Sequence, residues 1–103
     1  MHYRLLSVML GSLVLAAIVA KPTRADTTKG SQLAQQWCAS CHVTSGSPAR
    51  NVQEGPPSFP TIARARTADQ LRAFVSHPHG AMPDLSLTRA EIDDLVGYIE
   101  TLR

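Results

Sequence analysis

The sequence predicts an all-α fold, and three observations lead to this prediction. Apolar side chains recur at three- and four-residue spacing in three separate stretches, as they do along one face of a helix. Two of these stretches open with a Thr-x-x-Gln or Thr-x-x-Glu pattern, which is typical of a helix N-terminus. No run of residues alternates between polar and apolar side chains for long enough to predict a strand.

The first helix is expected over about residues 29–39, where the apolar side chains form one stripe. This stripe consists of Leu33, Ala34, Trp37 and Cys38. The span from Thr44 to Pro60 follows, and it is rich in glycine, proline and serine. We expect this span to be a loop, because glycine and proline interrupt regular structure.

A second helix is expected to begin after Thr67. Thr67 and Gln70 have the spacing of a capping box, in which each side chain satisfies a free N–H group of the first turn. The buried face expected of this helix consists of Leu71, Phe74 and Val75. The helix should end at His77, because Pro78 disfavours helical backbone in the residue before it.

The last helix is expected to begin after Thr88. Thr88 and Glu91 have the spacing of a second capping box, and Leu87 and Ile92 flank it as a hydrophobic staple. The apolar stripe of this helix consists of Ile92, Leu95, Val96, Ile99 and Leu102. A stripe of this length on an otherwise polar helix indicates one face packed against a core.

Residues 1–25 are predicted to be a secretory signal peptide. A short basic segment precedes an apolar run of 16 residues, Leu5–Ala20, and small residues stand three and one before a cut after Ala25. Cleavage after Ala20 and retention as an N-terminal anchor are the alternatives. The run is shorter than the roughly 20 residues that span a bilayer. We therefore expect a periplasmic or otherwise extracytoplasmic protein with no membrane span after cleavage.

The remaining residues, 26–103, are expected to form one small domain. They contain seven Lys or Arg and eight Asp or Glu, which gives a net charge of about −1. This balance argues against a nucleic-acid-binding protein, which would carry a basic stripe. A domain of this size has a small core and usually needs a disulfide, a metal or a cofactor for stability.

Cys38-Ala39-Ser40-Cys41-His42 is the C-x-x-C-H motif of covalent haem attachment. Two thiols on one helical turn can form thioether bonds with the two vinyl groups of a single haem. The following histidine then lies beneath the macrocycle, where a ring nitrogen can bind the iron. The motif accounts for both cysteines in the sequence.

Three other uses of the cysteine pair have less support. A thioredoxin-type thiol oxidoreductase would require a βαβ pattern, which the sequence lacks. A disulfide across so short a loop would be strained, and it would leave His42 unexplained. A zinc site needs four ligands, and the sequence has no second pair at zinc-finger spacing.

The sequence resembles class I c-type cytochromes over residues 29–102, through an N-terminal helix leading into C-x-x-C-H, a Gly-Pro loop, a methionine loop and a C-terminal helix. The resemblance implies three to four helices wrapped around one covalently attached haem c. In this family the second axial ligand is a methionine some forty residues or more after the motif, often followed by proline. Met82-Pro83 matches, and Met82 is the only methionine outside the predicted signal peptide.

Other axial arrangements stay open. Met82 could instead fill a gap in the core, as many lone methionines do. His77 and His79 lie close before it and could bind the iron in its place, which would give a bis-histidine haem of lower potential. An open iron site is the third arrangement, and it would suit a gas sensor.

The resemblance implies further roles. A proline carbonyl after a glycine accepts a hydrogen bond from the axial histidine in this family, and Pro56 is the closer match, with Pro57 next to it. The first and last helices cross tightly at Gly30 and Gly97-Tyr98. Ala34 replaces the usual aromatic residue, so Trp37 is expected to supply the bulk. Two arginines are candidate partners of the haem propionates: Arg64 and Arg66.

The expected function is electron transfer by a single haem with His42 and Met82 as axial ligands, between redox proteins such as a dehydrogenase and an oxidase or reductase. We expect a monomer without enzyme activity, because two protein ligands leave substrates no access to the iron. An electron-entry subunit of a larger oxidoreductase complex is the main alternative.

Overall fold

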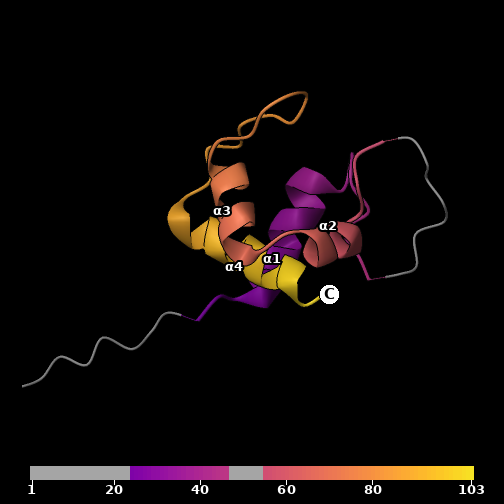
Figure 1. The fold of residues 1–103 in the computed structure, drawn as a ribbon. Coiled ribbons are helices and arrows are strands. Elements are labelled where there is room, and N and C mark those ends of the chain that lie inside the picture. Colours follow the sequence, from indigo (N-terminus) through magenta and orange to yellow (C-terminus); the bar gives the residue numbers. More distant parts are fainter. Residues whose placement is uncertain (1–23, 47–54) are drawn as a thin grey trace, which may run out of the picture.

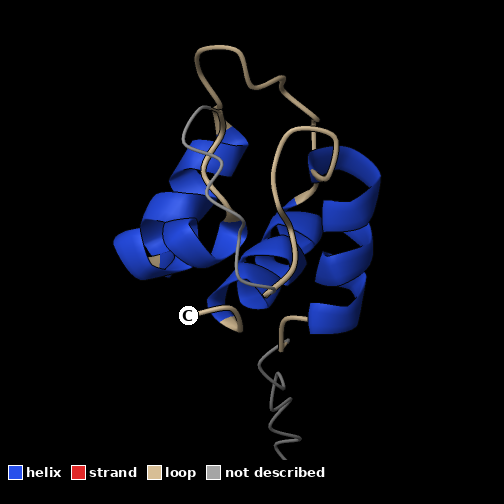
Figure 2. Cartoon of the chain, turned by 90° about the vertical axis from the view of Figure 1, so that its right-hand side faces the viewer, coloured by secondary structure: helices blue, strands red, loops and turns tan. Residues whose placement is uncertain are grey.

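The computed structural model describes residues 24–46 and 55–103, and in these residues every regular element is a helix (Figures 1 and 2). The predicted all-α fold is therefore confirmed. The predicted signal peptide, apart from Arg24 and Ala25, lies outside the described residues. In chain order the elements are α1 (Thr27–Leu33), η1 (Ala34–Cys38), α2 (Phe59–Ala65), α3 (Ala68–Ser76) and α4 (Arg89–Glu100).

No helix in these two described ranges is long and apolar enough to cross a membrane.

The first and last helices, α1 and α4, cross in close contact (Figure 1). A Cβ atom at Gly30 would lie 2.0 Å from the carbonyl oxygen of Asp94 and 2.8 Å from the Cβ atom of Tyr98. Only glycine therefore allows this approach of the two backbones. Gly97 also lies close to the N-terminal segment, since a Cβ atom there would lie 2.7 Å from that of Ala25. These contacts agree with the tight crossing expected at Gly30 and Gly97-Tyr98.

The first helix differs from its predicted course. It begins at Thr27, because the Asp26 side chain accepts a hydrogen bond from the Lys29 N–H at 3.0 Å and caps the first turn. It then widens into a π-helical turn, in which the Ala39 N–H donates to the Ala34 carbonyl five residues earlier. Ala34 is fully buried, whereas Trp37 is 49% exposed. The expectation that Trp37 fills the helix crossing is therefore wrong.

Helix α2 was not predicted, because the sequence from Thr44 to Pro60 reads as a loop. The Ser58 hydroxyl accepts a hydrogen bond from the Thr61 N–H at 3.3 Å, and Pro60 lies in the first turn, where proline is well tolerated. Phe59 and Ala63 are buried on the inner side of this helix. A Ser-x-Pro start followed by apolar residues at helical spacing is a signal that could have revealed α2.

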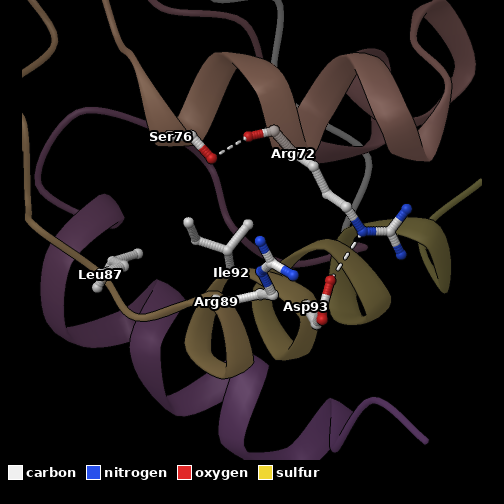
Figure 3. Close-up of a pocket in the computed structure, with 6 residues that line it drawn as sticks. All are labelled: Arg72, Ser76, Leu87, Arg89, Ile92 and Asp93. Carbon is white, nitrogen blue, oxygen red and sulfur yellow. Dashed lines mark hydrogen bonds and ion pairs between the residues drawn. The ribbon is translucent and has the colours of Figure 1, made fainter. Parts of the chain in front are cut away.

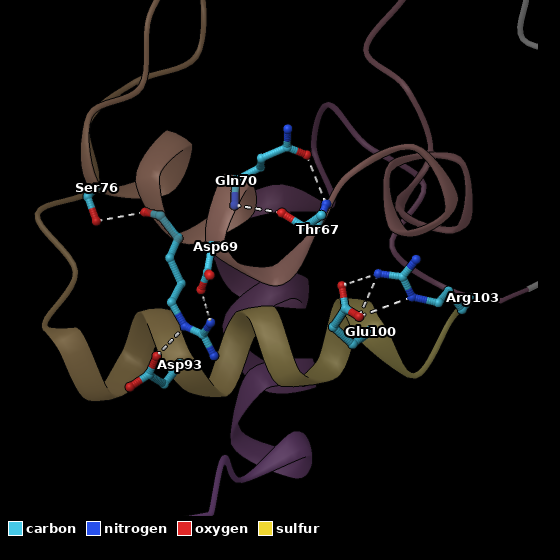
Figure 4. A network of polar contacts seen from close by, with 8 residues as sticks. Thr67, Asp69, Gln70, Ser76, Asp93, Glu100 and Arg103 are labelled. Atoms are coloured by element: carbon cyan, nitrogen blue, oxygen red, sulfur yellow. Dashed lines mark hydrogen bonds and ion pairs between the residues drawn. The ribbon is translucent and has the colours of Figure 1, made fainter.

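Helices α3 and α4 begin as predicted, each with a complete capping box at Thr67 and Thr88. The two helices pack together, and Arg72 of α3 bridges them: its Nε lies 2.8 Å from Asp93 Oδ1 of α4 (Figure 3). Arg72 also pairs with Asp69 on its own helix at 3.0 Å (Figure 4). These exposed pairs contribute little to stability, about 0–1 kcal/mol each.

The core lies between the helices, and α4 supplies almost half of it. Its buried residues are Ala34, Cys38, Phe59, Ala63, Leu71, Ile92, Leu95, Val96 and Ile99. Tyr98 packs against this core, and its hydroxyl donates to the carbonyl of buried Thr44. The segment after the C-x-x-C-H motif is thereby tied to the last helix.

Candidate functional site

A cavity of about 830 Å³ opens beside this core. Its wall combines the C-x-x-C-H segment, α2, α3, α4 and the loop between α3 and α4. Apolar side chains dominate the interior, and they include Phe59, Leu71, Phe74, Leu95 and Ile99. Cofactor pockets in proteins typically measure about 300–1,000 Å³ and have such apolar linings, so the cavity has the size and chemistry of a cofactor site.

Both cysteines of the motif line this cavity. Cys38 ends the π-helical turn and is 6% exposed, whereas Cys41 is exposed. The chain turns tightly here, since the N–H groups of Cys41 and His42 both donate to the Cys38 carbonyl, at 3.1 and 2.9 Å. Burial raises the pKa of the Cys38 thiol above its ordinary value, because the thiolate would lose hydration. The two cysteines are not joined to each other by a disulfide.

The His42 ring is held by one hydrogen bond and by one aromatic contact. Its Nδ1 atom lies 2.7 Å from the carbonyl oxygen of Pro57. A carbonyl can only accept, so Nδ1 carries the proton and Nε2 keeps its lone pair for a metal. The ring also packs at a tilt against Phe59, with 5.6 Å between ring centroids. The partner is thus Pro57, and the preference for Pro56 was wrong, although both prolines line the cavity.

Met82 lies in the loop between α3 and α4 and lines the same cavity as His42. It is half-buried, with Ala81 and Pro83 beside it on the cavity wall. Gly80 has a positive φ of 73°, which favours glycine and turns the loop shortly before Met82. The structure therefore brings all four predicted site residues, Cys38, Cys41, His42 and Met82, to one cavity.

The structure distinguishes between the members of two residue pairs that the sequence could not tell apart. His79 lines the cavity, but His77 does not. Likewise Arg66 lines the cavity and Arg64 does not. The Arg66 carbonyl accepts a hydrogen bond from Arg103 Nη2 at 3.1 Å, so this segment is tied to the end of the chain.

These residues fit a covalently bound haem. Two thiols, an imidazole with a free Nε2 and a thioether line one apolar cavity, and this donor set matches haem attachment and axial ligation. A zinc site has no such support, because no cluster of three His, Cys, Asp or Glu residues suited to a metal ion occurs in the described part of the chain.

Comparison with known proteins decides the family. Residues 25–99 match the family described as cytochrome c oxidase, cbb3-type, subunit III. The chain belongs to this family of c-type cytochromes. It is also 36% identical to cytochrome c-552 of Bradyrhizobium diazoefficiens, over the whole of this chain and 99% of that protein. No solved structure matches the cytochrome.

The family and this relative confirm the resemblance drawn from the sequence and the cytochrome c fold. The cytochrome carries haem c, bound covalently, with its iron, and it functions in electron transfer. Phe59 of α2 supports the His42 ring. The sequence did not indicate Trp37 as a cavity residue, and it lines the cavity while being 49% exposed.

Proposed function

We propose that the cytochrome passes single electrons between extracytoplasmic redox proteins through a haem bound to Cys38 and Cys41, with His42 and Met82 as its axial ligands. The observation that carries this proposal is that all four side chains line one apolar cavity. The haem, when bound, supplies an iron that changes between the ferrous and ferric states.

Each ligand has a distinct task in this proposal. Cys38 and Cys41 anchor the group covalently, and His42 offers Nε2 because Nδ1 is engaged by Pro57. Such a hydrogen bond fixes the ring and makes it a stronger donor. The Met82 thioether favours ferrous iron more than a second imidazole would, and it therefore raises the potential.

This arrangement supports a carrier rather than an enzyme. Two protein ligands would occupy both axial positions, so no substrate could reach the iron without displacing one of them. The apolar wall formed by residues such as Phe59, Leu95 and Ile99 would limit contact with water. An electron can still cross the exposed part of the site, where the side chains of Trp37 and Cys41 face solvent.

We further propose that residues 1–25 are a signal peptide and that residues 26–103 form the mature domain in the periplasm or an equivalent compartment. The apolar run before Lys21-Pro22 supports export. Covalent haem attachment on the export side agrees with this location. The partners would be a dehydrogenase and an oxidase or reductase, which the cytochrome meets as a monomer.

One alternative has a specific observation in its favour. The matching family is described as a subunit of cbb3-type cytochrome c oxidase, which suits an electron-entry subunit of a larger complex. Salt-sensitive co-purification with a larger enzyme would support the subunit, and a monomer at all salt concentrations would support the shuttle.

A gas sensor would require Met82 to leave the iron, and carbon monoxide binding by the wild-type ferrous protein at neutral pH would indicate it.

The deciding experiment is an absorption spectrum and an intact mass of the exported protein. We expect a c-type spectrum, one haem in the mass, loss of residues 1–25, and the near-infrared thioether-to-iron band of ferric His/Met haem. Met82→Leu keeps nearly the same volume and should abolish the band and lower the potential. Leu85→Ala is the matched control, since Leu85 lines the cavity from the same loop but has no sulfur. A band that survives Met82→Leu would refute the ligand assignment.

A further inference from the structure

The loop between α3 and α4 brings a second nitrogen donor to the cavity. Of its two imidazoles, only that of His79 lines the cavity, together with Met82. His79 stands three residues before Met82, so their Cα atoms are at most about 11 Å apart even in a fully extended chain. Both donors therefore belong to one short segment of the same cavity wall.

The ring of His79 is positioned by an aromatic neighbour. It meets Phe74 of α3 edge-on, with 4.8 Å between ring centroids and 83° between ring planes. Phe74 lines the cavity as well, so this contact places the imidazole next to the cavity interior. Within the described residues, no hydrogen bond or ion pair engages either nitrogen of His79. A neutral imidazole in this state offers one ring nitrogen as a ligand.

The backbone of the loop offers little resistance to a shift of this ring. Gly80 adopts a positive φ of 73° between His79 and Met82. The hydrogen bond within the loop, from the Ser86 N–H to Asp84 Oδ1 at 2.8 Å, lies beyond Met82. Segments with few backbone hydrogen bonds are the first to open locally. A change of donor from Met82 to His79 would therefore involve two residues of this one loop, which has few backbone hydrogen bonds to hold it in place.

We propose that His79 is a reserve axial ligand, which binds the haem iron whenever the sulfur of Met82 is not bound to it. This inference rests on the proposed function. In the exchange the bond between sulfur and iron breaks and a bond from an imidazole nitrogen forms, without electron transfer. The resulting bis-histidine iron has a lower potential and stays closed to small molecules. When the sulfur of Met82 leaves the iron, the haem would therefore change to the lower potential. The iron would still be closed to carbon monoxide, because His79 occupies the position.

The test uses the complete haem-loaded protein in four forms: wild type, Met82→Ala, Met82→Ala/His79→Ala and Met82→Ala/His77→Ala. Met82→Ala should give a low-spin ferric electron paramagnetic resonance spectrum of the bis-histidine type. Removal of His79 should turn the iron high-spin and tighten carbon monoxide binding by about tenfold or more, because a His79-bound iron binds only after the imidazole leaves. Removal of His77 is the matched control and should change neither property.

The possible outcomes separate this inference from the proposed function. A high-spin Met82→Ala protein, or a change caused by His77→Ala but not by His79→Ala, overturns the role of His79. The single variant His79→Ala should keep the thioether-to-iron band of the wild type. A wild type that lacks this band and becomes high-spin in His79→Ala would overturn both, since His79 would then be the resident ligand. Met82→Leu repeats the series with the loop volume preserved, should Met82→Ala fold poorly.

Discussion

The Nδ1 atom of His42 lies 2.7 Å from the carbonyl oxygen of Pro57, 15 residues further along the chain. This hydrogen bond joins the haem-attachment segment to the start of α2. It also fixes which ring nitrogen points away from the loop with a free lone pair. The orientation of the proposed axial ligand therefore depends on the position of Pro57, two residues before α2 begins at Phe59.

Replacement of Pro57 by glycine should loosen this hydrogen bond. The carbonyl would remain, but the loop would lose the fixed φ angle of proline and gain freedom in the unfolded chain, at a cost of about 1 kcal/mol in stability. Exchange of the His42 ring N–H with solvent, measured by NMR on the ferrous protein, should become faster. Pro56→Gly is the control and should leave that exchange near the wild-type rate. The reverse result would make Pro56 the functional partner.

A side chain at position 30 should disrupt the crossing of α1 and α4. The Cβ atom in Gly30→Ala would lie 2.0 Å from the Asp94 carbonyl oxygen, so the two backbones must separate. We expect a loss of about 3 kcal/mol in the free energy of unfolding, at the upper end for overpacking. Denaturant unfolding of the haem-loaded protein measures it. Gly46→Ala serves as the control, since its Cβ atom would meet Leu102 at an ordinary 3.5 Å. Equal stability of the two variants would contradict the crossing.

The capping box of α4 should make stability depend on pH. Hydrogen bonds from the backbone N–H and the hydroxyl of Thr88 lower the pKa of Glu91 below its ordinary value of 4.5. Because the pKa is lower in the folded state, this stabilisation is complete above about pH 5 and is lost as the pH falls through the folded-state pKa. Glu91→Gln keeps an acceptor oxygen but cannot titrate. The stability difference between wild type and Glu91→Gln should therefore shrink as the pH falls below about 5, and a constant difference would exclude this role.

Removal of the proposed signal peptide should strengthen a contact with α4. The Asp26 backbone nitrogen lies 2.7 Å from Asp94 Oδ1. Cleavage after Ala25 would turn this nitrogen into a charged amino group, so the hydrogen bond would become an ion pair. Asp94→Asn keeps the acceptor and removes the charge, and it should destabilise the protein that starts at Asp26 by about 0.5–1 kcal/mol.

The control for this effect is the same substitution in a protein that starts at Lys21, as cleavage after Ala20 would leave it. There the Asp26 nitrogen is an uncharged amide, so Asp94→Asn should have a much smaller effect. Thermal unfolding of the four proteins at low ionic strength measures the difference, and N-terminal sequencing identifies the natural cut. Equal effects in both backgrounds would show that the new terminus does not pair with Asp94.

Features that depend on adjacent residues could be predicted from the sequence. The caps at Thr67 and Thr88 are complete within four residues, and both helices begin where these patterns place them. Met82 could be identified as a candidate because the other methionines belong to the predicted signal peptide. Its position in the cavity follows from the loop between two correctly predicted helices.

Features that depend on the path of the chain could not be predicted in this way. Pro56 and Pro57 give the same local signal, and the contact with His42 selects Pro57. His77 and His79 are likewise equivalent candidates in the sequence, and only the folded loop shows that His79 lines the cavity and His77 does not. The π-helical turn at Ala34–Cys38 could not be predicted from the residue types in it. Its hydrogen bond spans five residues, and this spacing reflects how the turn packs in the fold. Helix α2 is different, since Ser58 and Pro60 could have revealed its start.

The packing of α4 around Cys38 bears on when the thiol of this residue can react. Cys38 is 6% exposed and belongs to the same buried cluster as Leu95, Val96 and Ile99 of α4. In the proposed function, attachment of haem before α4 packs against this cluster would leave the Cys38 thiol open to reaction, and α4 would then enclose it.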